Sequence, residues 1–202
     1  MIAQPEPTVA AAAGCCCKAG AYGARRRRRY LQAHCALPRR KRWELDRGLG
    51  HCGSEVIGEM YVPRGRLVDF MHAAAAGFRR HAVDLIYGTI RLIERDTESF
   101  LPWARQDYAC VIFNLHTPHT LEGIEATQQA LRRLIDMAIA RGGSFYLTYS
   151  RAATAEQVRA CYPDIGRFFE AKRRYDPQQR FQSSWYRHYQ PLLAAASAAQ
   201  AA

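Results

Sequence analysis

The apolar residues between positions 53 and 149 change period from two to about 3.6 and back again, and this order limits the possible folds. Alternating polar and apolar residues predict four strands, over residues 55–62, 83–94, 108–116 and 144–149. Apolar spacings of three and four predict two helices, one over residues 64–80 and one from Thr120 to Gly142-Gly143. The order strand, helix, strand, strand, helix, strand predicts an α+β fold of the ferredoxin-like kind, an antiparallel sheet with both helices on one face.

A further helix is expected after the fourth strand. Thr154 and Gln157 have the spacing of a capping box, and Pro163 interrupts the helix before apolar residues resume. The final residues, 190–202, are mostly alanine, and we expect them to form a disordered tail.

The N-terminal segment differs from the rest of the chain in its charge. Residues 1–50 carry eleven basic and three acidic side chains, a net of +8, whereas the whole chain carries +11. The segment lacks helix or strand periodicity, so we expect residues 1–52 to be disordered. Its arginine runs are typical of a solvated tail, a targeting signal, or a contact with nucleic acid or acidic lipid. Because the excess charge lies outside the patterned region, a globally cationic nucleic-acid binder is disfavoured.

Targeting and cysteine patterns favour a cytoplasmic protein. No run approaches the roughly 18 consecutive apolar residues that a membrane helix needs. The N-terminus lacks the basic region of a secretory signal. The seven cysteines are odd in number and form no C-x-x-C pair, so neither a disulfide framework nor a zinc site is predicted.

One face of the expected sheet is left without helices and therefore needs another cover. It carries Glu59, Tyr61, Tyr87, Thr89, Arg91, Asn114 and His116. Arg91 is the most informative of these residues, because a cation in mid-strand has two explanations. It could orient an oxygen-rich substrate and stabilise a developing oxyanion, or it could form a structural salt bridge with Glu59.

Other candidates on this face are weaker. His116 and His119 suggest a metal site, but no third ligand is in place and an ordinary surface pair is the favoured interpretation. Tyr146 and Tyr149 could donate hydrogen bonds to a ligand or could pack in the fold. The sequence shows no glycine-rich phosphate loop, nucleophile elbow or metal motif.

Three stretches carry a family resemblance: residues 54–64, residues 88–91, and residues 171–177 followed by Phe181. The last has the pattern K-x-x-x-D-P-x-x-x-F and is the most specific. Together these stretches, within residues 53–189, resemble the C-terminal substrate (cap) domain of FAD-linked oxidoreductases of the vanillyl-alcohol oxidase type, near the aldonolactone and alditol oxidases.

The resemblance implies a function for the open face. In that family the face closes over the isoalloxazine ring of FAD and forms the substrate site. It implies oxidation of a CH–OH group by hydride transfer to FAD, with Arg91 as the catalytic residue. The substrate-binding residues would be Thr89, Asn114, His116 and Tyr149.

The chain also departs from the family pattern. Thr89 stands where alditol-oxidase-like members have a Glu, and Tyr146-Leu147-Thr148-Tyr149 replaces a His-Trp-Gly-Lys motif. Gln182-Ser183 replaces the closing Asn-Pro. These differences leave the substrate within the CH–OH class open.

The family's FAD-binding domain precedes the cap, and residues 1–52 do not resemble any part of it. We therefore expect a truncated or split chain that is inactive alone, with a small hydroxylated substrate and a separately encoded FAD-binding domain as partners. The alternative is a ferredoxin-like nucleic-acid-binding module with a basic N-terminal arm. Nucleic acid is the less favoured partner, since residues 108–116 lack the aromatic RNA-binding signature. A fragment without function is the third possibility.

Overall fold

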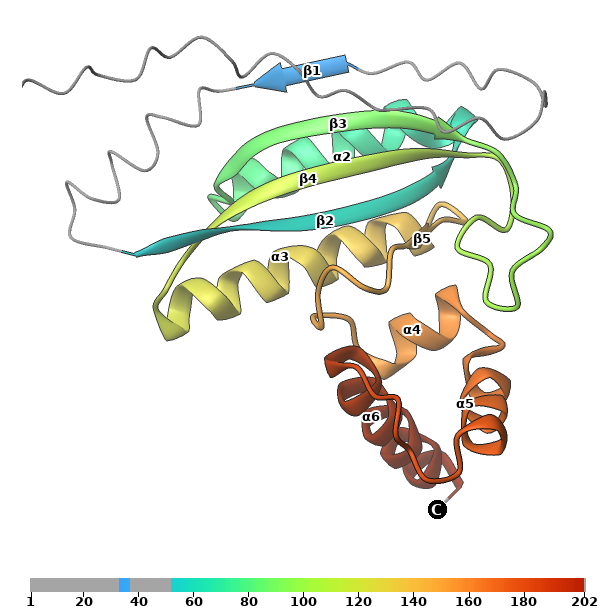
Figure 1. Cartoon of the computed structure of the whole chain (residues 1–202). Coiled ribbons are helices and arrows are strands. Elements are labelled where there is room, and N and C mark those ends of the chain that lie inside the picture. The colour runs from blue at the N-terminus through green and yellow to red at the C-terminus, as the bar shows by residue number, and fades with distance from the viewer. Residues whose placement is uncertain (1–32, 37–51, 202) are drawn as a thin grey trace, which may run out of the picture.

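The computed structural model describes residues 33–36 and 52–201 (Figure 1). Its antiparallel sheet has the strand order β1-β3-β4-β2-β5. The strands are β1 (Ala33–Ala36), β2 (Gly53–Pro63), β3 (Leu85–Ile93), β4 (Tyr108–Pro118) and β5 (Ser144–Phe145). Without β1, this order is that of a ferredoxin-like sheet, and the predicted α+β class is confirmed.

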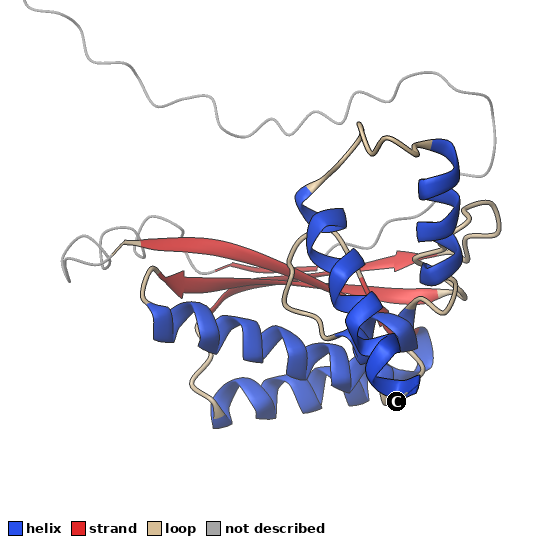
Figure 2. Ribbon diagram, turned by 90° about the horizontal axis from the view of Figure 1, so that it is seen from below, coloured by secondary structure: helices blue, strands red, loops and turns tan. Residues whose placement is uncertain are grey.

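Two long helices cover one face of the sheet (Figure 2). They are α2 (Leu67–Arg80), preceded by the short η1 (Arg64–Arg66), and α3 (Leu121–Ile139). The hydroxyl of Thr120 accepts the Gly123 N–H at 3.0 Å and caps α3 as predicted. The apolar rows of β2 and β4 meet these helices in the main core, where Met60, Val111 and Leu131 are each at most 2% exposed.

Three more helices form the C-terminal end of the molecule: α4 (Ala155–Cys161), α5 (Ile165–Tyr175) and α6 (Ser184–Ala201). The predicted capping box is present, because Thr154 and Gln157 exchange side-chain and backbone hydrogen bonds at the start of α4. Residues 190–201 continue α6, and Leu193 is buried in the main core. The prediction of a disordered tail is therefore wrong for these residues.

Two other segments differ from the sequence-based expectation. The fourth strand ends at Phe145 instead of residue 149, because a turn over residues 147–149 takes the chain away from β2. β1 comes from the segment expected to be disordered, and it pairs with β3 from Ala33 opposite Ile90 to Ala36 opposite Tyr87. The rest of that expectation, apart from Cys52, lies outside the described residues.

The K-x-x-x-D-P-x-x-x-F residues run from the last turn of α5 into the connection to α6. The ammonium group of Lys172 makes an ion pair with the Asp176 carboxylate one helical turn away. The same carboxylate accepts the backbone N–H groups of Arg180 and Phe181, each at 2.9 Å. Asp176 thus fixes the path of the chain after α5.

Gly143 joins the end of α3 to the sheet at a point with no room for a side chain. A Cβ atom there would lie 2.1 Å from the Tyr61 carbonyl oxygen and 2.7 Å from that of Ala138, and both are backbone atoms. We expect Gly143→Ala to lower the free energy of unfolding by about 2 kcal/mol or more, because the backbone must shift. Urea denaturation would measure the change. Gly166→Ala is the control, because a Cβ at this helical position would have nothing within 4 Å. Its free energy of unfolding should equal or exceed that of the wild type. Equal losses in both variants would contradict this explanation.

Acid should weaken the turn at Asp176. The Lys172 ammonium, with the N–H groups of Phe181 and Arg180, lowers the pKa of Asp176 from its usual value to about 2. A carboxylate that is more acidic in the folded state than in the unfolded state stabilises the fold above the unfolded pKa, and this contribution disappears as the pH falls through the folded pKa. Asp176→Asn should therefore lose stability at neutral pH, and its deficit should shrink below about pH 4. Urea midpoints of both proteins measured across this range would test it, and a deficit that stays constant down to the lowest pH would contradict it.

Candidate functional site

The second face of the sheet holds the polar residues predicted for it. The pairing registers place Tyr61, Cys110 and Arg91 in one row across β2, β4 and β3. The next row holds Glu59 and Thr89 on either side of Ile112. Side chains two residues apart on a strand share a face, so these rows are neighbours on the face opposite the helices.

The prediction that this face is left open is wrong at one end of it. The β3–β4 connection, residues 94–107, folds back over one end of it and buries Ala104 completely. The Trp103 ring meets Tyr61 edge to face, with ring centroids 5.4 Å apart. Tyr61 and Tyr108 are consequently at most 1% exposed and form a second, smaller core. The covering loop carries no periodic pattern, so its position over the sheet could not be predicted from local sequence.

At the edge of this small core lies a buried carboxylate. Glu59 is 8% exposed, and its Oε1 accepts hydrogen bonds from the Tyr61 hydroxyl at 2.8 Å and the Cys110 thiol at 3.0 Å. Burial raises the pKa of Tyr61 and of Cys110, and the nearby Glu59 charge raises both further. Both groups therefore stay protonated at neutral pH and remain donors to Glu59.

Arg91 extends from the same face and is exposed. Within the part of the chain that the structure describes, its guanidinium has no ion-pair partner, so the predicted alternative of a salt bridge to Glu59 is absent there. The donors that Glu59 receives instead come from Tyr61 and Cys110. Arg91 thus keeps its donors available for another group.

Tyr149 completes this cluster. The turn after β5 brings its ring within 4.9 Å of the Tyr146 ring, between centroids, and leaves Tyr149 49% exposed. Partial burial raises the pKa of Tyr149, the Glu59 charge raises it further, and the Arg91 charge opposes both effects. The phenol is therefore within electrostatic reach of the carboxylate and the guanidinium. Glu59, Arg91 and Tyr149 form what we call the acid–arginine site.

The other predicted residues lie at increasing distance from this site. Thr89 is buried. It lies on β3 opposite Ile112 of β4, and Glu59 of β2 lies opposite the same residue from the other side. Asn114 follows Cys110 by four residues on β4, a distance of about 13 Å. Its amide donates to Glu55 Oε2 at 2.6 Å, and its Oδ1 is buried without a hydrogen-bond partner.

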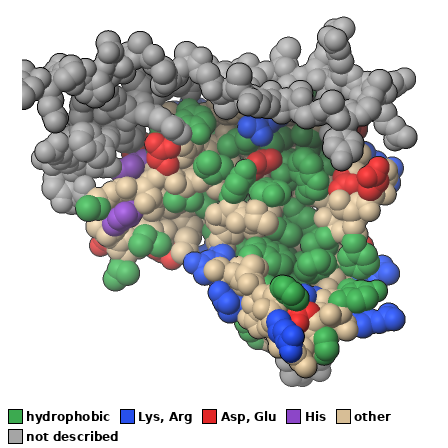
Figure 3. All heavy atoms as spheres, viewed as in Figure 1, with side chains coloured by type: hydrophobic (Ala, Val, Ile, Leu, Met, Phe, Trp, Pro, Cys, Tyr) green, Lys and Arg blue, Asp and Glu red, His purple; other side chains and the backbone are tan. Residues whose placement is uncertain are grey.

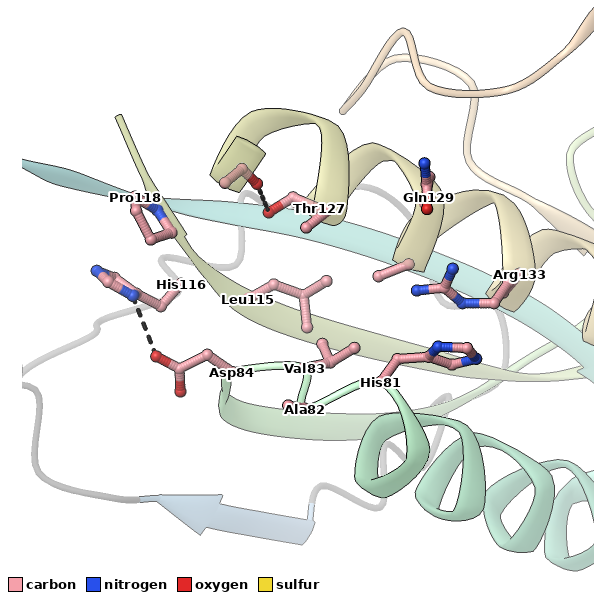
Figure 4. A pocket seen from close by; sticks show the side chains of 13 residues that line it. His81, Ala82, Val83, Asp84, Leu115, His116, Pro118, Thr127, Gln129 and Arg133 are labelled. Carbon is pink, nitrogen blue, oxygen red and sulfur yellow. Dashed lines mark hydrogen bonds and ion pairs between the residues drawn. The ribbon is translucent and has the colours of Figure 1, made fainter. Parts of the chain in front are cut away.

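His116 lies at the opposite end of the sheet, about 20 Å along β4 from Cys110. Its Nδ1 is 3.1 Å from Asp84 Oδ2, at the mouth of a cavity of about 330 Å³ that also receives Arg133 (Figure 4). His119 bonds instead to Ser54 Oγ at 2.6 Å, so the two histidines do not share a site. Among the described residues, no group of three or more His, Cys, Asp or Glu side chains could hold a metal ion.

Strand alternation predicted Glu59 on this face, but Glu59 was not among the predicted site residues. The donor Cys110 and the covering residue Trp103 were missed altogether. The alternation of β2 and β4 carried a usable signal, since it places Glu59 and Cys110 on the same face of paired strands. Their contact depends on a diagonal between strands, which becomes visible only once the register is known.

The comparisons with known proteins leave the family open. A scan against protein-family models finds no match for this chain, and a search of the curated proteins finds none either. In the part of the chain that the structure describes, no helix is long and apolar enough to cross a membrane.

Removal of the Glu59 carboxylate should show how far the small core depends on it. Glu59→Ala leaves the Tyr61 hydroxyl and the Cys110 thiol without an acceptor in a buried place, and we expect a loss of about 1–3 kcal/mol in unfolding free energy. Glu59→Gln keeps an acceptor oxygen and should lower the free energy of unfolding by less than Glu59→Ala does. Urea denaturation of the two variants would compare them. If Glu59→Ala is as stable as the wild type, the carboxylate does not organise this face.

Proposed function

We propose that this chain is the substrate-binding domain of an FAD-dependent oxidoreductase that acts on a CH–OH group. The observation that carries the proposal is the acid–arginine site, where an arginine that has no salt bridge among the described residues lies on one sheet face with a buried carboxylate. The resemblance of residues 53–189 to the cap domain of such enzymes supplies the reaction class.

The chemistry of the site suits a hydroxylated substrate. Oxidation of an alcohol passes a hydride from carbon to the hydride acceptor and the hydroxyl proton to solvent water, so negative charge develops on the oxygen. The Arg91 guanidinium, with several N–H donors and a permanent charge, stabilises that oxygen. The exposed phenol of Tyr149 can donate a hydrogen bond to, or accept one from, a neighbouring hydroxyl group of the substrate. Arg91 is thus the catalytic residue of the proposal, and Tyr149 positions the substrate.

The fit of FAD to these residues is partial. FAD, when bound, supplies the hydride acceptor. The face offers the exposed rings of Trp103 and Tyr149 and the buried, unpartnered Oδ1 of Asn114 to a planar, donor-bearing ring. The chain's sequence has no glycine-rich loop for the pyrophosphate. We therefore propose that a separately encoded FAD-binding domain holds the cofactor, that the chain is inactive alone, and that the pair works in the cytoplasm.

The nucleic-acid alternative receives less support from the same face. Sheets that bind single-stranded RNA stack bases on accessible aromatic side chains of the central strands. Here the corresponding aromatic residues, Tyr61 on β2 and Tyr108 on β4, are buried under the β3–β4 connection.

Substrate binding by the chain itself would test the role of Arg91. With xylitol as the probe, saturation-transfer NMR should detect binding, and Arg91→Ala should weaken it by about tenfold through loss of a charged hydrogen bond. Arg80→Ala, which removes an exposed arginine at the end of α2, is the matched control and should leave the affinity for xylitol unchanged. The purified chain should be colourless.

Three outcomes would overturn the proposal. The first is absence of xylitol binding even at near-saturating xylitol concentration. The second is equal affinity in the wild type and Arg91→Ala. The third is visible flavin absorbance in the purified chain, which would contradict a cofactor held by another domain.

A further inference from the structure

A groove between α5 and α6 lies apart from the acid–arginine site. It has a volume of about 450 Å³, within the range of small-molecule sites. Its aromatic wall is formed by Phe168, Phe181, Trp185 and Tyr186, and its cations are Lys172 and Arg180. Figure 3 shows Lys and Arg side chains among hydrophobic ones at the end of the molecule formed by these two helices.

The loop that carries two of these residues is held in a fixed shape. Asp176 accepts the backbone N–H groups of both Arg180 and Phe181, and Gln179 just before them takes a left-handed φ of 52°. Hydrogen bonds and an unusual backbone conformation thus fix residues whose side chains make little contact with the fold. Phe181 remains 79% exposed. An aromatic ring presented in this way on an ordered turn is suited to contact a ligand.

The charges of the groove favour an anionic ligand. Lys172 is neutralised by its ion pair with Asp176, and its ammonium lies 5.1 Å from the centre of the Tyr186 ring. Arg180 has no ion-pair partner in the described part of the chain. The net charge of the groove is therefore one positive charge at its rim.

The aromatic wall favours a planar ligand. The Phe168 and Trp185 rings pack with centroids 6.4 Å apart, so the groove has an extended apolar surface beside the exposed Phe181. The Trp185 indole N–H and the Tyr186 hydroxyl are buried without hydrogen-bond partners. Buried donors of this kind are usually satisfied, so these two unsatisfied groups on groove-lining residues call for an explanation.

We propose that this groove binds a nucleoside phosphate, with the base against Phe181 and the aromatic wall and the phosphate at Arg180. Bases stack on aromatic side chains without regard to sequence, and a guanidinium can make two parallel hydrogen bonds to phosphate oxygens. The proposal goes beyond the oxidoreductase function and does not rest on it.

Calorimetric titration of the full chain with three probes would test the proposal. AMP carries both recognised groups, adenosine only the base, and inorganic phosphate only the charge. AMP should bind more tightly than either of the others. Arg180→Gln should weaken AMP about tenfold and leave adenosine unchanged, because it removes the phosphate partner alone. Phe181→Ala should weaken AMP and adenosine several-fold but not phosphate.

A matched control separates this groove from general surface attraction. Phe100 is also an exposed aromatic residue beside an arginine, with the Arg167 guanidinium 5.6 Å from the centre of its ring. Phe100→Ala should leave the AMP affinity unchanged. Urea midpoints should show that all three variants fold, since each removes an exposed side chain.

The proposal is overturned if AMP binds no better than phosphate, or if Arg180→Gln binds AMP as the wild type does. An equal loss of affinity in Phe100→Ala and Phe181→Ala would overturn it as well. The first and third results would assign the aromatic wall to packing alone, and the second would remove the phosphate from Arg180. None of them depends on the outcome for Arg91.

Discussion

The pairing of β2 with β4 determines where every residue of the acid–arginine site lies. The two strands pair over their full eleven residues, from Gly53 opposite Pro118 to Pro63 opposite Tyr108. A slip of one residue would turn the Glu59 side chain toward the helices and place Met60 on the other face. That slip is disfavoured on the core face, where a Cβ in place of Gly58 would lie 2.4 Å from a methyl group of the buried Leu131 side chain. The close approach of α3 thus favours the register on which the site depends.

The periodic segments could be predicted because burial leaves its pattern directly in the sequence. The alternation in β2 and the apolar stripe of α3 were sufficient for the element order and for the face of Glu59 and Arg91. α6 escaped prediction because its alanines carry little amphipathic contrast. Its burial comes from a few larger residues, such as Leu193 and Tyr189, that contact the main core.

The candidate site was only partly predictable, for a different physical reason. Arg91 stood out because a charge in mid-strand is unusual, and Tyr149 because its phenol could donate a hydrogen bond to a ligand. Trp103 and the burial of Tyr61 depend on an irregular loop, whose path is set by tertiary contacts rather than by local periodicity. His116 was grouped with Arg91 because strand alternation gives the face of a residue and not its distance along the strand.

The site and the α5–α6 groove share one electrostatic arrangement. In each, a carboxylate is satisfied by donors close to it, Glu59 by a phenol and a thiol, and Asp176 by an ammonium and two backbone N–H groups. Because those acceptors are already occupied, the neighbouring Arg91 and Arg180 are not drawn into salt bridges with them. A structural arginine is normally placed where a carboxylate can pair with it. Within the described residues Arg91 and Arg180 have no such partner, so neither arginine stabilises that part of the fold through an ion pair, and both proposals assign them instead to ligands that carry oxygen atoms.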